Sequence, residues 1–290
     1  MENKTNDRKS VIMIVSSMLI FGTIGIFRRF IPLSSAFLAF ARGILGGLFL
    51  LAFVRLKKKG TGEKLASRDL RLLAFTGALI GINWMLLFEA YNHTTVAIAT
   101  LCYYMQPTIV VLLSPFIFKE KLTTKKALCA AAAIIGMVLV SGVIGDRSSQ
   151  SGNLKGILLG LGAAVFYATV VIMNKQLRGI DAYQKTTVQL LSAGIIMIPY
   201  LLLTNSISSG AFSLTAVILL LVVGIVHTGI AYVMYFGSMD GLRVQSIALL
   251  SYIDPVSALL LSALFLREPL SALSILGAVL IIGSAIISEI

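Results

Sequence analysis

The chain has 290 residues, of which 58% are hydrophobic and only 12% are charged. A soluble globular protein carries about twice that share of charge, so the composition excludes a water-soluble domain. The charges form short clusters between apolar runs that are long enough to cross a bilayer, which takes about 20 residues. These runs predict an all-α polytopic membrane protein. They exclude a transmembrane barrel, whose strands would show ~10-residue alternating segments.

The net charge of +12 does not indicate a nucleic-acid-binding protein. Most Lys and Arg residues lie in loops that flank the apolar runs, where they act as topology signals. Cys102 and Cys129 both lie inside apolar runs, without the spacing of a metal site or a disulfide framework. We expect no metal, no cofactor and no nucleic-acid partner.

The first predicted element follows Arg8 and Lys9 and runs from Val11 to Phe27. It resembles a signal peptide at its start, but it lacks a small-x-small cleavage site, so we interpret it as an uncleaved helix. In chain order the sequence predicts ten spans, at 11–30, 36–54, 70–91, 95–118, 125–144, 154–174, 184–203, 214–236, 242–266 and 270–289.

The distribution of basic residues predicts the orientation of these spans. With the N-terminus in the cytoplasm, 18 of the 24 Lys and Arg residues fall on the inner side and five on the outer side, and Arg42 lies within a span. Cytoplasmic loops carry such an excess of positive charge. We therefore expect both termini in the cytoplasm.

An internal duplication divides the chain. The stretch Tyr104-Met-Gln-Pro107 leads into an apolar run that ends at Lys119-Glu120, and 148 residues later Tyr252-Ile-Asp-Pro255 leads into one that ends at Arg267-Glu268. A fixed offset of half the chain indicates a repeat. The predicted units are a five-helix repeat at 11–144, a linker at 145–153 and a second five-helix repeat at 154–289.

Five spans per repeat is an odd number, so the two repeats must enter the membrane in opposite directions. Inverted repeats are typical of secondary transporters, which bind substrate near the membrane midplane and work by alternating access. Two fused repeats can form one cavity, so we expect a monomer with a small-molecule substrate in the lipid bilayer.

The repeat also predicts a binding site. Asp254 falls near mid-membrane, its repeat partner is Gln106, and each directly precedes a proline, Pro255 or Pro107. A proline within a span has no N–H to donate, which leaves a carbonyl free one turn earlier. This pairing is typical of a site for an amine or a proton. The alternative is that Asp254 pairs with Arg42 or another helix and only holds the bundle together.

Charged groups in a bilayer are costly and therefore call for a role. Arg42 is a candidate for binding a substrate carboxylate, and Glu89 is a candidate for a coupling proton. A structural ion pair between the two is an equal alternative. His227, in the middle of the eighth span, is a candidate proton relay, or else a hydrogen-bonded core residue.

Aromatic residues complete the predicted site. They could line a cavity or sit at the membrane interface, where aromatic rings are enriched. The candidates for substrate contact are Tyr104, Tyr252, Trp84 and Tyr232, and Tyr91, Tyr103 and Tyr167 belong to the same group.

The sequence resembles the EamA family of the drug/metabolite transporter superfamily. The resemblance lies in the ten spans, in the two aromatic-x-x-Pro stretches that end in basic-Glu, in Phe21-Gly22-Thr23 and in Phe40-Ala41-Arg42. It implies an inner-membrane exporter of amino acids or other small metabolites, with a central cavity between the halves. It does not name the substrate, and the family has no universal catalytic motif.

The leading hypothesis is therefore an exporter of a small polar metabolite that works by alternating access and is coupled to protons. Efflux of cationic drugs or toxic compounds is an alternative, and a non-transporting membrane scaffold is another. We expect no enzyme, because His-Glu-x-x-His and Gly-x-Ser-x-Gly are both absent from the sequence.

Overall fold

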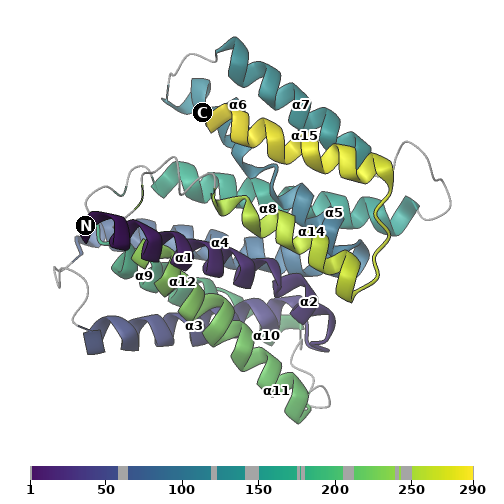
Figure 1. Ribbon diagram of the computed structural model, residues 1–290. Helices are drawn as coiled ribbons and strands as arrows, with labels where there is room; N and C mark the ends of the chain where they lie inside the picture. The colour runs from purple at the N-terminus through teal and green to yellow at the C-terminus, as the bar shows by residue number, and fades with distance from the viewer. Residues whose placement is uncertain are drawn as a thin grey trace.

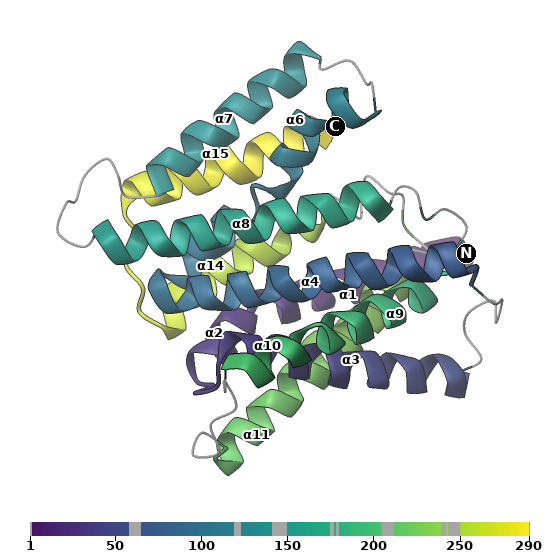
Figure 2. The ribbon, with the colours of Figure 1, turned by 180° about the vertical axis from the view of Figure 1, so that it is seen from behind.

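The computed structural model describes residues 2–57, 65–118, 123–140, 150–174, 177, 180–204, 212–238, 242 and 250–289. In this part of the chain all regular structure is helical, as the composition predicts. Figures 1 and 2 show most of the helices side by side with their long axes in similar directions. This arrangement lets each helix turn one side toward its neighbours and the other side toward lipid.

The helices of the described residues follow one another in chain order. In the first half they are α1 (Glu2–Gly22), α2 (Ile24–Arg29), α3 (Ser35–Lys57), α4 (Ser67–His93), α5 (Val96–Tyr103), α6 (Gln106–Phe118) and α7 (Thr124–Val140). In the second half they are α8 (Gln150–Asn174), α9 (Ala182–Ile195), α10 (Met197–Thr204), α11 (Leu214–Leu221), the π-helix η2 (Val222–Ile230), α12 (Ala231–Ser238), α14 (Ile253–Phe265) and α15 (Ala272–Glu289).

Seven stretches of the described chain are long and apolar enough to cross a membrane. They correspond to the first four and to the sixth, seventh and eighth predicted spans. The other predicted spans appear as the shorter helices α7, α14 and α15. The ninth span was predicted at 242–266, and of that range only 242 and 250–266 lie in the described part.

The run predicted as one span at 95–118 is in fact two helices, α5 and α6, separated by a turn at Tyr104 and Met105. Pro107 explains the break, because it has no N–H for the Tyr103 carbonyl and is tolerated only in the first turn of the next helix. Its repeat partner Pro255 also lies in the first turn of a helix, α14, directly after a turn at Tyr252. The two related prolines therefore break the helix at related places.

Two parts of the predicted repeat organisation lie wholly or partly outside the described residues. Lys119-Glu120, which ends the first repeated stretch, lies outside the described residues, as do 145–149 of the predicted linker. Residues 150–153 form the first turn of α8 instead of linker.

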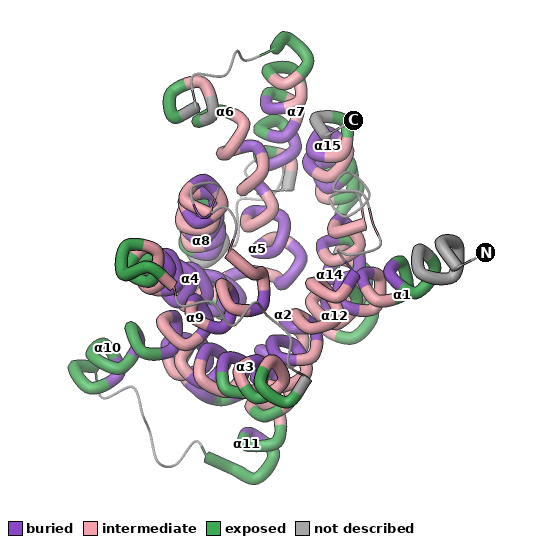
Figure 3. Tube along the Cα trace, turned by 90° about the vertical axis from the view of Figure 1, so that its left-hand side faces the viewer, coloured by how far each residue is buried: buried purple, intermediate pink, exposed green. Residues whose placement is uncertain are grey.

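Small residues allow the central helices to pack closely. Seen along the helices, buried residues face the middle of the bundle, whereas α10 and α11 at its edge are largely exposed (Figure 3). Helices α3 and α4 both contact α9, and α4 also contacts α8. Gly43 on α3 and Gly77 on α4 lie at these contacts: a Cβ atom on Gly43 would lie 2.5 Å from the Gly194 nitrogen, and one on Gly77 2.5 Å from the Gln189 carbonyl oxygen. Close backbone approach through small residues is the usual packing of helices in membranes.

Gly43→Val is expected to destabilise the protein, because the added side chain must push the α3 and α9 backbones apart. Overpacking of a close-packed site costs about 1–3 kcal/mol. We expect a clear fall in the midpoint of thermal unfolding of the detergent-purified protein. Gly283→Ala is the control, since a Cβ at Gly283 has nothing within 4 Å. Equal melting temperatures for the two variants would contradict this account of the α3–α9 contact.

Candidate substrate-binding pocket

A cavity of about 500 Å³ lies between the two halves of the chain. Helices α1 to α6 line it from the first half, and α8, α12 and α14 from the second. Most of its wall is apolar or aromatic. Its charged side chains are Arg42 and Asp254, and its other polar groups include Thr100, Gln106 and Ser251. A largely apolar cavity with a few converging polar groups is typical of a small-molecule site.

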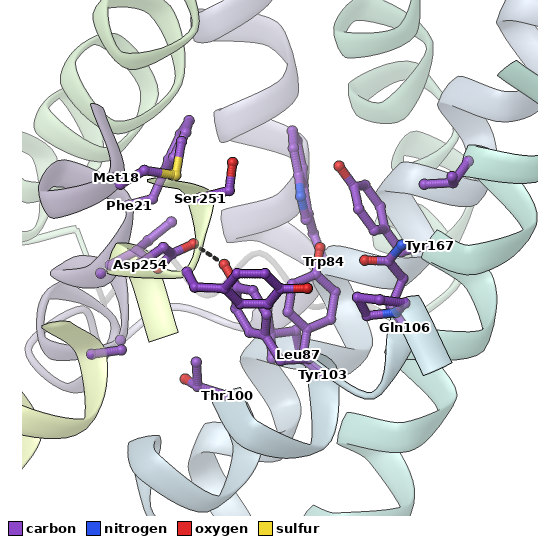
Figure 4. A pocket seen from close by; sticks show the side chains of 18 of the residues that line it. Met18, Phe21, Trp84, Leu87, Thr100, Tyr103, Gln106, Tyr167, Ser251 and Asp254 are labelled. Carbon is purple, nitrogen blue, oxygen red and sulfur yellow. Dashed lines mark hydrogen bonds between the residues drawn. The ribbon is translucent and has the colours of Figure 1, made fainter. Parts of the chain in front are cut away.

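Asp254 reaches this cavity from the first turn of α14. Its Oδ2 accepts a hydrogen bond of 2.5 Å from the Tyr104 hydroxyl, so the two repeat-related turns meet at this contact (Figure 4). Gly22 on α1 makes room for the α14 backbone, because a Cβ there would lie 2.9 Å from the Asp254 carbonyl oxygen. The hydrogen bond and the close approach together fix the carboxylate at the wall of the cavity.

Arg42 reaches the cavity from α3 and is only 6% exposed. Its Nε donates a hydrogen bond of 2.9 Å to the Thr228 hydroxyl, and its guanidinium carbon lies 4.1 Å from the centre of the Trp84 ring. Thr228 lies on η2, and its hydroxyl donates a hydrogen bond to the Val223 carbonyl. These residues are five positions apart, which is the hydrogen-bond spacing of a π-helix. The stacked and hydrogen-bonded guanidinium is therefore held in one orientation.

Aromatic rings make up much of the remaining wall. Tyr103 lies edge-on to Tyr104 and tilted to Tyr167, with ring centres 5.7 Å apart in each case. Phe21 meets Tyr232 edge-on at 5.4 Å. The tyrosines that line the cavity are Tyr91, Tyr103, Tyr104, Tyr167, Tyr232, Tyr235 and Tyr252. Their rings offer faces for a cation or an apolar group, and their hydroxyls offer hydrogen bonds.

The cavity is closed at one end and more open at the other. Lining residues near the C-terminal end of α4 and the start of α5 are buried, among them Leu87, Tyr91 and Thr100. Lining residues toward the C-terminal ends of α8 and α12 are half-exposed, among them Val171 and Tyr235. The less buried part of the lining therefore lies toward the second end.

The structure brings together most of the residues that the sequence predicts for the site. The cavity is lined by Arg42, Trp84, Tyr104, Gln106, Pro107, Tyr232, Tyr252 and Asp254. Asp254 and Gln106, the pair related by the repeat, both lie on this cavity, one from each half (Figure 4). Pro255 is buried in the first turn of α14 and is not among the lining residues.

Glu89 and His227 do not line this cavity. The Glu89 carboxylate accepts hydrogen bonds from Ser35 at 2.7 Å and Asn92 at 3.0 Å, and lies 3.2 Å from His93. Among the described ion pairs none joins Glu89 to Arg42, the structural alternative that the sequence left open for these two residues. Arg42 and Asp254 likewise form no ion pair among the described residues, and Asp254 bonds instead to Tyr104 of another segment.

His227 lies behind the wall of the cavity. Its Nε2 is 2.8 Å from the Thr23 hydroxyl, and its ring meets Phe27 edge-on at 4.6 Å. These contacts are those of a hydrogen-bonded core histidine, joining η2 to the turn between α1 and α2. His227 is not among the residues that line the cavity.

Among the residues that sequence reasoning missed are Ser251 and Tyr235, which line the cavity, and Thr228, which bonds to Arg42. Ser251 directly precedes the repeated tyrosine and lines the cavity, so the repeat itself carried a signal for it. Tyr235 is one turn beyond Tyr232 on α12, and the same helix face could have indicated it. Thr228 had no such signal, because its role depends on the π-helix that turns it toward Arg42.

Tyr104→Phe is expected to weaken substrate binding about tenfold, because the variant keeps the ring and loses the hydrogen bond to Asp254. A hydrogen bond to a charged group contributes about 1.5–3 kcal/mol. The measurement is the concentration of competing substrate that halves counterflow in proteoliposomes. Tyr200→Phe is the control, since Tyr200 lies on α10 and is 45% exposed. Equal affinities in the two variants would rule out a role for the Tyr104 hydroxyl.

A multi-pass helical membrane protein with a partly polar cavity between two related halves has the architecture of a membrane transporter. The model of the EamA-like transporter family matches residues 8–142 and, separately, residues 154–289. The chain belongs to the EamA-like transporter family.

Similar proteins agree with this assignment. The uncharacterized transporter YxxF of Bacillus subtilis (strain 168) is 32% identical over 259 residues, which cover 88% of this chain and 81% of that one. Protein PecM of Dickeya dadantii (strain 3937) is 27% identical over 222 residues, covering 76% and 73%. A solved crystal structure with 20% identity covers 96% of both chains at a TM-score of 0.65, and this likeness concerns the fold alone. The names of the family and of its members indicate a transporter and not an enzyme.

Proposed function

We propose that this transporter exports a small zwitterionic metabolite, of the amino-acid class, by alternating access. The observation that carries the proposal is the presence of one carboxylate, Asp254, and one guanidinium, Arg42, on the wall of the same aromatic cavity. The two groups are not paired with each other among the described ion pairs. A ligand that brings one ammonium and one carboxylate would neutralise both.

The cost of burying charge supports this reading. An ionised side chain deep in a membrane protein is unfavourable unless it is paired or serves a substrate. Tyr104 donates one hydrogen bond to Asp254, and Thr228 and Trp84 hold Arg42, but none of these partners brings a countercharge. A zwitterion would supply the missing countercharges without adding net charge to the cavity.

The size and lining of the cavity limit the substrate further. A cavity of about 500 Å³ lies toward the lower end of the range for small-molecule sites. The aromatic part of its wall is formed by tyrosines, Phe21 and Trp84. These rings suit an apolar or aromatic side chain.

Efflux of cationic compounds is the second candidate. The tyrosine rings and the Asp254 carboxylate favour it, because aromatic faces and a carboxylate together attract an organic cation. Arg42 opposes it, since its positive charge lies on the wall of the same cavity. The two candidates therefore differ in the role of Arg42.

We also assign the coupling proton to Asp254. In the absence of substrate, a proton can neutralise its carboxylate, and a substrate ammonium can then replace that proton at the same oxygen. This exchange links proton entry to substrate exit. Glu89 and His227, the other candidates from the sequence, do not line the cavity and are left without this role.

The proposal includes a topology. Ten spans arranged as two inverted repeats, with both termini in the cytoplasm, fit the distribution of basic residues, and the family model matches the two halves separately. The open end of the cavity then faces the cytoplasm, which is the side that an exporter loads from. The protein is expected to act as a monomer in the bacterial plasma membrane. Reporter fusions at each loop test the orientation.

Counterflow in proteoliposomes tests the proposed function. The probes are radiolabelled L-phenylalanine and L-leucine, and phenethylamine, which has the ring and the ammonium but lacks the carboxylate. Uptake of the amino acids in preference to the amine supports a zwitterion site. Preference for the amine favours cation efflux, and absence of flux for all three probes and for a metabolite extract favours a non-transporting scaffold.

A further inference from the structure

The carboxylate of Glu268 lies at the closed end of the molecule, outside the substrate cavity. Its Oε1 accepts hydrogen bonds from the Val96 backbone N–H at 3.0 Å and from Nη2 of Arg29 at 3.2 Å. Its Oε2 accepts a longer hydrogen bond of 3.4 Å from the Ala97 N–H. The side chain of Glu268 is only 9% exposed, whereas that of Arg29 is 35% exposed.

These contacts join three elements from both halves of the chain. Arg29 ends α2, Val96 begins α5, and Glu268 follows α14, so a single carboxylate connects the second half to two helices of the first. Arg29 adds a hydrogen bond of 2.8 Å to the Thr94 carbonyl, just before α5. Figure 1 shows α2 beside the C-terminal end of α14, and the two helices are in contact.

The same three helices line the cavity. Ile24 on α2, Thr100 on α5 and Ala258 on α14 are all buried lining residues. The contacts of Glu268 lie beyond them, toward the closed end. If α14 moved away from α2 and α5, a path would open from this end into the cavity.

The backbone next to Glu268 is strained. Arg267 has a φ of 52°, in the left-handed region that non-glycine residues rarely adopt. Such a conformation persists where its surroundings hold it in place. The N–H groups of Leu266 and Glu268 both point to the Ser262 carbonyl, at 2.9 Å and 3.4 Å. The tight end of α14 places the carboxylate at the start of α5.

We propose that Glu268 is a gate residue of the transport cycle, which holds the Arg29 end of the cavity closed in this conformation and releases it when the cavity opens there. The interactions suit a gate. A carboxylate at a helix N-terminus is favoured by the partial positive charge of the free N–H groups. Water can replace its bond to the part-exposed Arg29 at small cost, so closure is reversible.

The sequence had singled out this residue only as part of a repeat. Glu268 is the repeat counterpart of Glu120, and each belongs to the basic-Glu pair that ends its repeated stretch. The repeat by itself assigns Glu268 no role in substrate binding. The gate depends on the assignment as a transporter and is independent of the substrate proposed above.

The test measures the opening of this end directly. Phe30→Cys and Ser271→Cys, in a protein with Cys102→Ala and Cys129→Ala, place spin labels at two exposed positions on either side of the Arg29–Glu268 contact. Pulsed electron paramagnetic resonance then gives the distance distribution in proteoliposomes without any substrate. Glu268→Gln should raise the ratio of long to short distances about tenfold, the effect of losing one charged hydrogen bond.

Arg29→Gln serves as the second gate variant and decides the test if Glu268→Gln fails to fold. Glu89→Gln is the matched control, because the contacts of Glu89 with Ser35, Asn92 and His93 all lie in the first half of the chain. The proposal predicts longer distances in both gate variants and an unchanged distribution in the control. Unchanged distributions in folded gate variants, or an equal shift in the control, would overturn it.

Discussion

Asp254→Asn is expected to reduce the transport rate at least thirtyfold and to make the remaining transport insensitive to an imposed pH gradient. The asparagine keeps the size of the side chain and can still accept a hydrogen bond from Tyr104. It loses the negative charge that we assign to the substrate ammonium and to the coupling proton. Truncating one partner of a buried charge pair costs about 2–5 kcal/mol, which corresponds to a factor of thirty or more.

The measurement is uptake into proteoliposomes with and without an imposed pH gradient, combined with counterflow at equal pH on the two sides. Asp181→Asn is the matched control. Asp181 caps the start of α9 by accepting a hydrogen bond from the Gln184 N–H at 3.0 Å, and asparagine caps helices equally well. A variant at Asp254 that folds, transports at the normal rate and still responds to the gradient would remove Asp254 from the mechanism.

Arg42→Gln has the second large effect, and its sign depends on the substrate. For a zwitterion we expect a loss of about thirtyfold in apparent affinity, because the substrate carboxylate would be left without its partner. For an amine that lacks the carboxylate we expect no loss or a gain, since a positive charge has left the cavity. Competition of L-phenylalanine and phenethylamine for counterflow measures both effects in one preparation.

Arg42→Lys separates charge from geometry. Lysine keeps the positive charge, but it cannot reproduce the planar stacking on Trp84 together with the hydrogen bond from Nε to Thr228. We expect a loss of affinity for the amino acid of about tenfold, between those of the native protein and Arg42→Gln. Arg71→Gln is the control, since Arg71 is exposed and donates a hydrogen bond of 3.3 Å to the Ser67 carbonyl of its own helix turn. Equal losses for amino acid and amine in Arg42→Gln would show that Arg42 supports the fold instead of the substrate.

The pair Gln106 and Asp254 illustrates how far the repeat could be used. Sequence comparison of the two halves put both residues just before a proline, and the cavity is lined by both of them. The repeat identified where the chain breaks, because a proline without an N–H disrupts a helix wherever it occurs. It could not show that Tyr104 from one turn donates to Asp254 from the other, since that bond depends on how the halves dock.

Arg42 and Glu89 illustrate the opposite case. Both are charged residues in apolar spans, so the sequence pattern does not distinguish their environments. An ion pair between them was one of the two alternatives. In the structure Arg42 stacks on Trp84, whereas Glu89 bonds to Ser35, Asn92 and His93. The rotation of each helix about its axis decides which neighbours a side chain meets, and hydropathy in a helix that is apolar on all sides does not define that rotation.

The sequence by itself determined the class of protein, the helical fold and the family. These conclusions follow from the long apolar runs, the clustered charge and the repeat. A long apolar run in lipid must satisfy its backbone hydrogen bonds locally, and a helix does so. Only the tertiary structure decided which charged residues share the cavity, where the π-helix holds Thr228 against Arg42, and which groups Glu268 contacts. These contacts join residues as far apart in the chain as Arg29 and Glu268, and they form only when the helices pack in one arrangement.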